Sequence, residues 1–230
     1  MTEPPAPERS RPDPGSTPLE YLFVVTYGRS GSTLLMGVLN SIPGYLVRGE
    51  NWDALHHLFR FHQTLAEGRT RWQPARMRQR THPFYGAADF PVKRSYARTR
   101  DLVVDTVLRP KHDTRVTGFK EIRWYQDDLE EFVAWLRKVF PGARFLINTR
   151  NHDEVLRSGW WAKRPEDAAV LPAIEERILA VAASLQEAAY RVHYNDYVAD
   201  PATLRGLFDW LGEPFDEARV REVMATRHSV

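Results

Sequence analysis

Cysteine is absent from this chain of 230 residues, and its absence excludes several kinds of chemistry. Without thiols the protein forms no disulfide, uses no thiolate nucleophile and offers no cysteine ligand to a metal. Long apolar runs are missing as well, since no stretch approaches the roughly 20 apolar residues of a membrane-spanning helix. We therefore expect a cytoplasmic protein in a reducing compartment, without a membrane span.

A large excess of charge of one sign is also missing, because 32 lysines and arginines oppose 30 acidic residues. Overall charge therefore points to no polyanionic partner. The first 18 residues contain six prolines and no apolar run. We expect residues 1–18 to form a disordered tail rather than a secretory signal. Residues 19–230 are long enough for one domain with a sizeable core.

The most informative segment is residues 21–35, which read YLFVVTYGRSGSTLL. An apolar run suited to a buried strand leads through the turn Gly28–Thr33 into apolar residues at helical spacing. A strand, a tight turn and a helix N-terminus in this order present backbone N–H groups to an anion, and the helix dipole adds partial positive charge. Hydroxyl side chains supply further donors. The segment therefore predicts a site for a phosphate or a similar oxyanion.

The turn departs from the Walker A motif of P-loop NTPases. That motif has the pattern G-x-x-x-x-G-K-[ST], in which the lysine reaches the outer phosphates. Here Gly31 follows Gly28 after only three positions, no lysine comes next, and Arg29 precedes the second glycine. No apolar run ending in an acidic residue is evident as a magnesium partner. An ordinary P-loop NTPase is therefore disfavoured.

Strand and helix patterns alternate along most of the chain. Strand patterns are expected at about 21–26, 45–47, 115–119, 144–148 and 190–194, and helix patterns at about 32–40, 52–66, 101–108, 128–139, 173–189, after Pro201 and after Asp216. Such alternation predicts an α/β fold of three layers, with a central parallel sheet of about four or five strands flanked by helices. A ligand is expected beyond the carboxyl ends of the strands.

Residues 68–100 interrupt this alternation with a basic insertion. The cations Arg69, Arg71, Arg76, Arg78, Arg80, Lys93, Arg94, Arg98 and Arg100 face one acid, Asp89, and aromatic residues are interleaved. A nucleic-acid site is one interpretation, but the nearly neutral chain and the absence of a nucleic-acid-binding motif disfavour it. A lid over the acceptor pocket, a site for an anionic acceptor, and a solvated loop stay open. Segments 52–100 and 160–172 are expected to shape the acceptor pocket.

Four features are expected at the same rim of the sheet. They are the turn at residues 28–33, Glu50 after a short extended segment, Lys120 at the end of a strand, and Arg150 after another strand with Ser158 on the next helix. The parallel arrangement brings them together, because the carboxyl ends of parallel strands share one edge.

These residues resemble the sulfotransferases that use 3′-phosphoadenosine 5′-phosphosulfate (PAPS), across about residues 20–215. The segment RSGSTLLMGVLNSIPGYLVRGEN is similar to the tyrosylprotein and bacterial branch of that family. The resemblance implies that Arg29, Ser30, Gly31, Ser32, Thr33 and Leu34 bind the 5′-phosphosulfate. It implies that Arg150 and Ser158 bind the 3′-phosphate, that Tyr194 contacts the nucleotide, and that Glu50 is the catalytic base. A basic, glycine-rich C-terminal loop of the family has no convincing match, although Arg227-His228 could contribute.

The implied reaction transfers a sulfuryl group from PAPS to a hydroxyl-bearing acceptor by in-line displacement, leaving 3′-phosphoadenosine 5′-phosphate (PAP). Glu50 would take the acceptor proton and Lys120 would stabilise the charge that develops on the leaving oxygen. No metal is required. Two rivals are a P-loop kinase for small molecules and a nucleotide-binding protein without turnover. Sugar, lipid, phenol, peptide tyrosine and secondary-metabolite acceptors all stay open, as does the oligomeric state.

Each site residue also has a plainer interpretation. Glu50 could be an acid near a helix N-terminus, Lys120 could pair with Glu121 or Asp127, and Tyr194 could belong to the core. Arg150 and Ser158 could be ordinary residues in or beside a helix. His56 or His57 could replace Glu50 as the base, although a structural or solvent-facing role is favoured. Trp160-Trp161 could stack on a nucleotide base or pack in the core.

Overall fold

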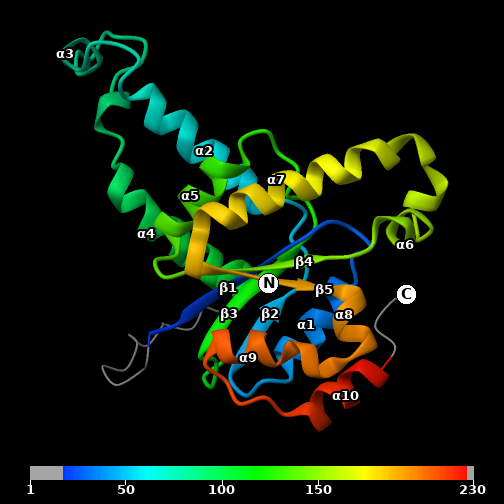
Figure 1. Ribbon diagram of the computed structural model, residues 1–230. Helices are drawn as coiled ribbons and strands as arrows, with labels where there is room; N and C mark the ends of the chain where they lie inside the picture. Colours follow the sequence, from blue (N-terminus) through cyan, green and yellow to red (C-terminus); the bar gives the residue numbers. More distant parts are fainter. Residues whose placement is uncertain (1–17, 227–230) are drawn as a thin grey trace, which may run out of the picture.

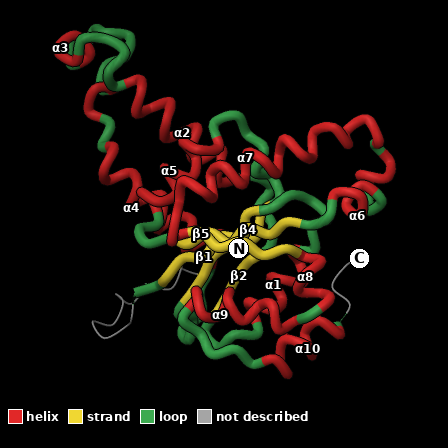
Figure 2. The backbone as a smooth tube through the Cα atoms, viewed as in Figure 1, coloured by secondary structure: helices red, strands yellow, loops and turns green. Residues whose placement is uncertain are grey.

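The computed structural model describes residues 18–226. Its central sheet has five parallel strands in the order β2-β3-β1-β4-β5. The strands are β1 (Glu20–Val25), β2 (Tyr45–Arg48), β3 (Val116–Glu121), β4 (Arg144–Thr149) and β5 (Ala189–His193). The predicted three-layer α/β fold is therefore confirmed, because helices cover both faces of this sheet (Figures 1 and 2).

The helices follow the predicted order with local differences. The α-helices are α1 (Ser32–Asn40), α2 (Ala54–Gly68), α3 (Pro74–Met77), α4 (Val92–Val103), α5 (Leu129–Val139), α6 (His152–Leu156), α7 (Val170–Leu185), α8 (Tyr194–Ala199), α9 (Arg205–Leu211) and α10 (Glu217–Ala225). Shorter helical segments are η1 (Ala87–Asp89), the π-helix η2 (Val104–Leu108), η3 (Trp161–Lys163), η4 (Pro165–Ala169), η5 (Gln186–Ala188) and η6 (Pro201–Leu204).

The alternation of side chains along β1 builds two cores. Phe23 and Val25 point into a core on the side of α5 and α7, whereas Leu22 and Val24 point into a core on the side of α1 and α9. Because successive strand residues face opposite sides, a strand buried on both faces has a continuous apolar sequence. The run at residues 21–25 is apolar for this reason.

The helix expected at 101–108 and the strand expected to end at Tyr194 differ from the structure. The helix expected at 101–108 is the end of a longer one, since α4 begins at Val92 and η2 continues it to Leu108. Its buried side reaches Val103, and Tyr96 stacks on His62 of α2. The high charge of residues 92–100 lies on its outer side. Tyr194 also differs, because it begins α8 instead of ending a strand.

The order of the strands creates a switch point beside β1. After β1, the chain passes through α1 to β2, which lies at one edge of the sheet with β3 between it and β1. After β3, the chain passes through α5 to β4, which lies on the other side of β1. The two helices cover opposite faces of the sheet (Figure 1). Ligands of open α/β sheets bind at such a point, outside the carboxyl ends of the strands.

Candidate functional site

The turn between β1 and α1 has the backbone conformation of an anion-binding loop. Arg29 and Gly31 both have left-handed backbone angles, with φ of 66° and 81°. Left-handed residues between right-handed ones direct successive N–H groups into one concavity. The helix α1 begins at Ser32, and the first N–H groups of a helix have no partner within it. The loop therefore offers several backbone donors to an anion.

Buried hydrogen bonds hold this loop to the neighbouring strand β4. Thr26 Oγ1 donates to the carbonyl oxygen of Asn148 at 2.6 Å and lies 2.7 Å from Ser30 Oγ. The amide of Asn148 donates to the carbonyl oxygen of Ser30, and its own oxygen accepts from the hydroxyl of Tyr197. Ser30 is fully buried, so its side chain supports the loop from behind and does not face the cleft.

A cleft of about 290 Å³ opens in front of the loop. Its lining residues are Gly28, Arg29, Gly31, Ser32, Thr33, Leu34, Glu50, Lys120, Ile122, Arg150, Trp160, Tyr194, Met224 and Thr226. The structure thus brings nine of the eleven predicted site residues to one cavity, and Ser30 and Ser158 are the two outside its lining. No residue of 52–100, which includes the insertion at 68–100, lines this cleft. Among the residues of 160–172 whose side chains the structure describes, Trp160 alone lines it.

Glu50 and Lys120 form an ion pair at this cleft. The Nζ atom of Lys120 lies 2.6 Å from Oε1 of Glu50, and the lysine side chain is almost completely buried. Lys120 therefore pairs neither with Glu121 nor with Asp127. Arg123 approaches the second carboxylate oxygen of Glu50 at 3.6 Å, so the carboxylate has cations on two sides.

Glu121 holds the backbone that follows Glu50. Its buried carboxylate accepts hydrogen bonds from the backbone N–H groups of Asn51 at 3.0 Å and Asp53 at 3.3 Å. Its other oxygen accepts from the N–H of Ile122 and from Arg123. Trp52 and Asp53 both have positive φ angles, of 55° and 65°, which are strained for residues other than glycine. The carboxylate of Glu121 thus stabilises an unfavourable turn directly after Glu50.

Arg150 lies at the cleft with its guanidinium already engaged. Its Nε and NH2 groups donate to Oε2 of Glu154 at 3.1 and 2.8 Å, and NH1 donates to the carbonyl oxygen of Arg29. The hydrogen bond from Arg150 lowers the pKa of Glu154. The guanidinium also lies 4.3 Å from the centre of the Tyr194 ring, a cation–π distance.

Ser158 differs from its predicted position on a helix. The helix α6 ends at Leu156, and Gly159 with a φ of 59° follows in a turn. The hydroxyl of Ser158 accepts a hydrogen bond from Nε of Arg29 at 2.9 Å. Ser158 therefore contacts Arg29 in the turn between β1 and α1, which we call the oxyanion loop (residues 26–31). The structure shows no contact between Ser158 and Arg150.

Two aromatic rings lie directly on the glycines of the loop. A Cβ atom on Gly31 would stand 2.0 Å from the Tyr194 ring, and one on Gly28 would stand 2.1 Å from the Trp160 ring. The two neighbouring tryptophans differ, because Trp160 is exposed at the cleft whereas Trp161 is buried and donates from Nε1 to the carbonyl oxygen of Gly28. Both glycines are required by these contacts, and Gly31 also by its backbone angle.

Neither histidine considered as an alternative base faces the cleft. His56 has its Nε2 atom 2.8 Å from Oδ1 of Asp128, and its ring lies edge-on to Phe132 in the core. His57 is exposed, and it does not line the cavity. The structure thus favours the structural and solvent-facing interpretation for these two residues.

Several residues of the site were missed by the sequence reasoning. Ile122, Met224 and Thr226 line the cleft, and Arg123 approaches Glu50. Ile122 and Arg123 follow Lys120 by two and three positions, and this closeness in the sequence was a usable signal for them. Nothing in the pattern of residues 217–225 indicated that α10 would reach the cleft. Arg227-His228 and most of the expected tail lie outside the described residues.

In residues 18–226 no group of three or more histidine or acidic side chains is arranged to hold a metal ion. Within the same residues no helix has the length and apolar character needed to cross a membrane.

The parallel sheet and the oxyanion-binding loop at its switch point place the protein among P-loop-type α/β folds. The profile described as "Sulfotransferase family" matches residues 22–217, so the chain belongs to the sulfotransferase family. Among proteins with curated annotation, none matches this sequence.

Solved structures show the same fold at low sequence identity. The sulfotransferase domain of the olefin synthase of Synechococcus PCC 7002 is 20% identical with a TM-score of 0.55, covering 92% of this chain and 80% of that domain's chain. The sulfotransferase domain from the curacin biosynthetic pathway is 14% identical with a TM-score of 0.53, covering 90% of this chain and 78% of its own. At these identities the likeness shows the fold alone.

Proposed function

We propose that this sulfotransferase transfers a sulfuryl group from PAPS to a hydroxyl-bearing acceptor. The observation that carries the proposal is the meeting of the Glu50–Lys120 ion pair with the oxyanion-binding loop in one cleft. A base, a buried cation and an anion cradle are what sulfuryl transfer between oxygens needs. Membership of the sulfotransferase family favours this reaction over the phosphoryl transfer of a kinase.

The residues of the cleft fit PAPS as the donor. The loop residues Arg29, Ser32 and Thr33 offer cationic, hydroxyl and backbone donors together. Arg150 adds a guanidinium next to the loop, where it donates to the carbonyl oxygen of Arg29, and a guanidinium can bind phosphate through two parallel hydrogen bonds. The Tyr194 ring packs on Gly31, so this position of the loop has no room for a side chain of its own. Such a cleft suits a ligand with more than one anionic group.

Each binding residue has a defined part in this proposal. Gly31, Ser32, Thr33 and Leu34 bind the 5′-phosphosulfate at the N-terminus of α1. Arg29 adds its charge, and Ser158 orients it through the hydrogen bond at Nε. Arg150 binds the 3′-phosphate and gives up its hydrogen bonds to Glu154, while its guanidinium stays over the Tyr194 ring. Ser30 does not touch the ligand; its buried hydroxyl supports the loop through the hydrogen bond with Thr26.

Glu50 and Lys120 carry the chemical step. PAPS supplies the sulfuryl group and a phosphate as leaving group. Glu50 takes the proton from the acceptor hydroxyl as that oxygen bonds to sulfur. Lys120 stabilises the negative charge that develops on the leaving oxygen, and its burial strengthens that interaction. Arg123 and Glu121 hold Glu50 in the orientation that this step needs.

The lining of the cleft also contains apolar side chains, those of Ile122, Trp160 and Met224. An acceptor with an apolar or aromatic body beside its hydroxyl suits these side chains. We place the protein in the cytoplasm, where PAPS would be accessible, and assign no metal to the reaction.

The test uses PAPS labelled with ³⁵S and a panel of a phenol, a sugar, a hydroxylated lipid and a tyrosine peptide. We expect label in at least one acceptor, with one PAP released for each sulfate transferred, in the presence of EDTA. Phosphate transfer from ATP–Mg²⁺ to these acceptors, with no transfer of label from PAPS, would contradict the proposal.

A further inference from the structure

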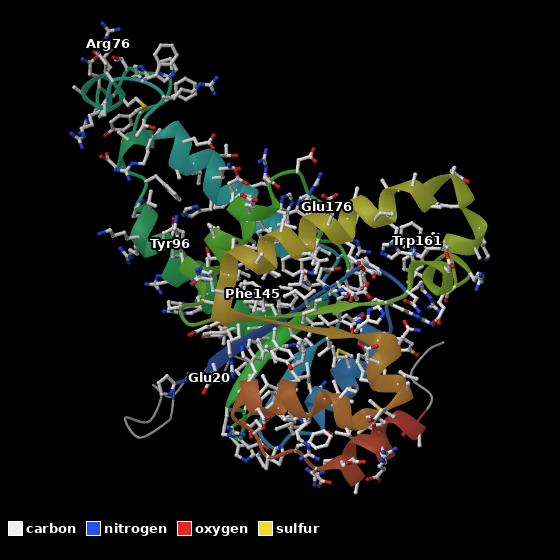
Figure 3. The ribbon with its side chains drawn as sticks, in the orientation of Figure 1. Glu20, Arg76, Tyr96, Phe145, Trp161 and Glu176 are labelled. Carbon is white, nitrogen blue, oxygen red and sulfur yellow. The ribbon has the colours of Figure 1, made fainter. Side chains whose placement is uncertain are left out.

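A helical arm projects from the sheet layers at a distance from the cleft. It consists of α2, α3, η1 and α4, and α3 lies at its far end (Figure 1). Arg76 marks this end in Figure 3, and Trp161, which contacts the oxyanion loop, lies on the other side of the molecule. No described residue of the arm lines the cleft, so nothing in this structure supports the lid alternative.

The end of the arm is a folded platform. Met77 of α3 is completely buried and Ala88 of η1 nearly so, and the N–H of Gly86 donates to the carbonyl oxygen of Met77 at 3.0 Å. Phe90 packs edge-on against His62 of α2. These contacts give the residues around them fixed positions on the surface.

The outer surface of this platform exposes aromatic rings. Trp72, Phe84 and Tyr85 are each about half exposed, at 51%, 54% and 56%. A hollow of about 750 Å³ beside them is lined largely by Leu65, Trp72, Phe84, Ala87, Phe90 and Pro91. Large exposed apolar patches on soluble proteins mark sites of interaction.

Positive charge is concentrated on the same platform. Residues 69–94 contain Arg69, Arg71, Arg76, Arg78, Arg80, Lys93 and Arg94 against the single acid Asp89, which pairs with Arg78. The whole chain has a net charge of only +2, so the remainder of the chain is net acidic. Charge segregated in this way on one projecting end attracts a negatively charged partner.

We propose that residues 64–94 dock the protein onto an anionic lipid surface. Arginines attract anionic headgroups, and tryptophan and tyrosine rings favour the boundary between headgroups and acyl chains. The end of the arm projects beyond the body, so it can reach a flat surface without interference from the rest of the molecule (Figure 3). The apolar hollow offers space for part of a lipid chain. The docking does not depend on sulfuryl transfer and leaves the cleft uncovered.

The test measures binding to vesicles of phosphatidylcholine with and without 30% phosphatidylglycerol, by sedimentation in about 0.1 M salt. The variant Arg71→Gln/Arg76→Gln/Arg80→Gln removes three exposed cations of the platform. The matched control Lys111→Gln/Arg137→Gln/Arg205→Gln removes three exposed cations elsewhere. A cation at an anionic surface contributes about fivefold to binding, so the arm variant should bind roughly a hundredfold more weakly than the control.

A second variant, Trp72→Ala/Phe84→Ala, tests the apolar contribution. It should weaken binding at high salt, where charges are screened but apolar insertion is not. The proposal would be overturned if the wild-type protein bound vesicles with and without phosphatidylglycerol equally well. It would also be overturned if the arm variant and its control bound anionic vesicles equally well. Absence of vesicle binding together with arm-dependent binding of polyglutamate would overturn it in favour of an acidic protein partner.

Discussion

Nζ of Lys120 and Oε1 of Glu50 lie 2.6 Å apart, although 70 positions separate these residues in the sequence. The pair joins the end of β3 to the loop after β2, two neighbouring strands of the sheet. In our account it places the base and the stabiliser of the leaving group on one side of the oxyanion loop.

Replacing Glu50 by glutamine should abolish turnover while PAP still binds. The amide accepts a hydrogen bond from Lys120 but cannot take a proton, so we expect kcat to fall by about 10²- to 10⁴-fold. Calorimetric titration should give a Kd for PAP close to that of the wild type. The exposed Glu131→Gln is the control and should leave both quantities unchanged. Turnover of Glu50→Gln near the wild-type rate would refute the assignment of the base.

Replacing Glu121 by alanine should lower both stability and turnover. The change leaves the part-buried N–H groups of Asn51, Asp53 and Ile122 without their acceptor, and three such unpaired donors together cost about 3 kcal/mol. For a chain of this size that corresponds to a fall in Tm of roughly 6–12 °C.

Glu121→Gln separates stability from positioning. It keeps one acceptor oxygen, so its Tm should fall less than that of Glu121→Ala, while kcat falls with the Kd for PAP unchanged. If Glu121→Ala lost PAP binding and turnover in the same proportion, Glu121 would be a general structural residue and not one that positions Glu50.

Replacing Gly31 by alanine should remove nucleotide binding. A methyl group there meets the Tyr194 ring and also requires a left-handed backbone, at φ 81°. Gly142 is a matched control, because it has a φ of 77° and a Cβ atom added to it would meet no atom within 4 Å. Gly142→Ala should therefore cost only the backbone penalty of about 1–2 kcal/mol. Equal losses of Tm in the two variants, with PAP binding intact in both, would show that the contact with Tyr194 is unimportant.

Tyr45 should make the protein lose stability in alkaline solution. Burial raises the pKa of Tyr45 to about 12 in the folded state, above its usual value of 10. Between these values the unfolded chain loses this proton and the folded chain keeps it, so the free energy of unfolding falls as pH rises. The contribution of the buried, neutral Tyr45 to the free energy of unfolding is complete below pH 10. It is lost between pH 10 and 12, at up to about 1.4 kcal/mol per pH unit.

Urea denaturation of wild type and Tyr45→Phe at several pH values from 9 to 12 measures this effect. Phenylalanine cannot ionise, so the free energy of unfolding of the variant should fall less steeply. Parallel curves for the two proteins would mean that Tyr45 ionises equally in the folded and unfolded states.

The sheet was predictable because its signal is local. Residues 21–25 and 145–147 are continuous apolar runs, as expected of strands buried on both faces, and Gly31 marks the start of α1. The beginning of α4 at Val92 was hidden, because its many arginines dominate the composition and only Tyr96 and Val103 reveal its buried side.

The contacts within the site were less predictable because they depend on the tertiary fold. Glu121 accepts from backbone groups of residues 51 and 53, and backbone donors leave no trace in the sequence. Ser158 contacts Arg29 instead of Arg150 because the chain turns away after Leu156. Glu50, Lys120 and Arg150 could be placed at one rim from the sequence, because each follows the carboxyl end of a parallel strand and these ends share one edge of the sheet.

A comparison of thermal shifts with PAP and with ATP–Mg²⁺ tests the central claim most directly. PAP at about 100 times its Kd should stabilise the protein by about 2.7 kcal/mol, or roughly 5–10 °C in Tm. Adenosine 5′-phosphate, which lacks the 3′-phosphate, should give a smaller shift, and Arg150→Gln should reduce the shift with PAP to a similar size. Stabilisation by ATP–Mg²⁺ together with no response to PAP would contradict the account.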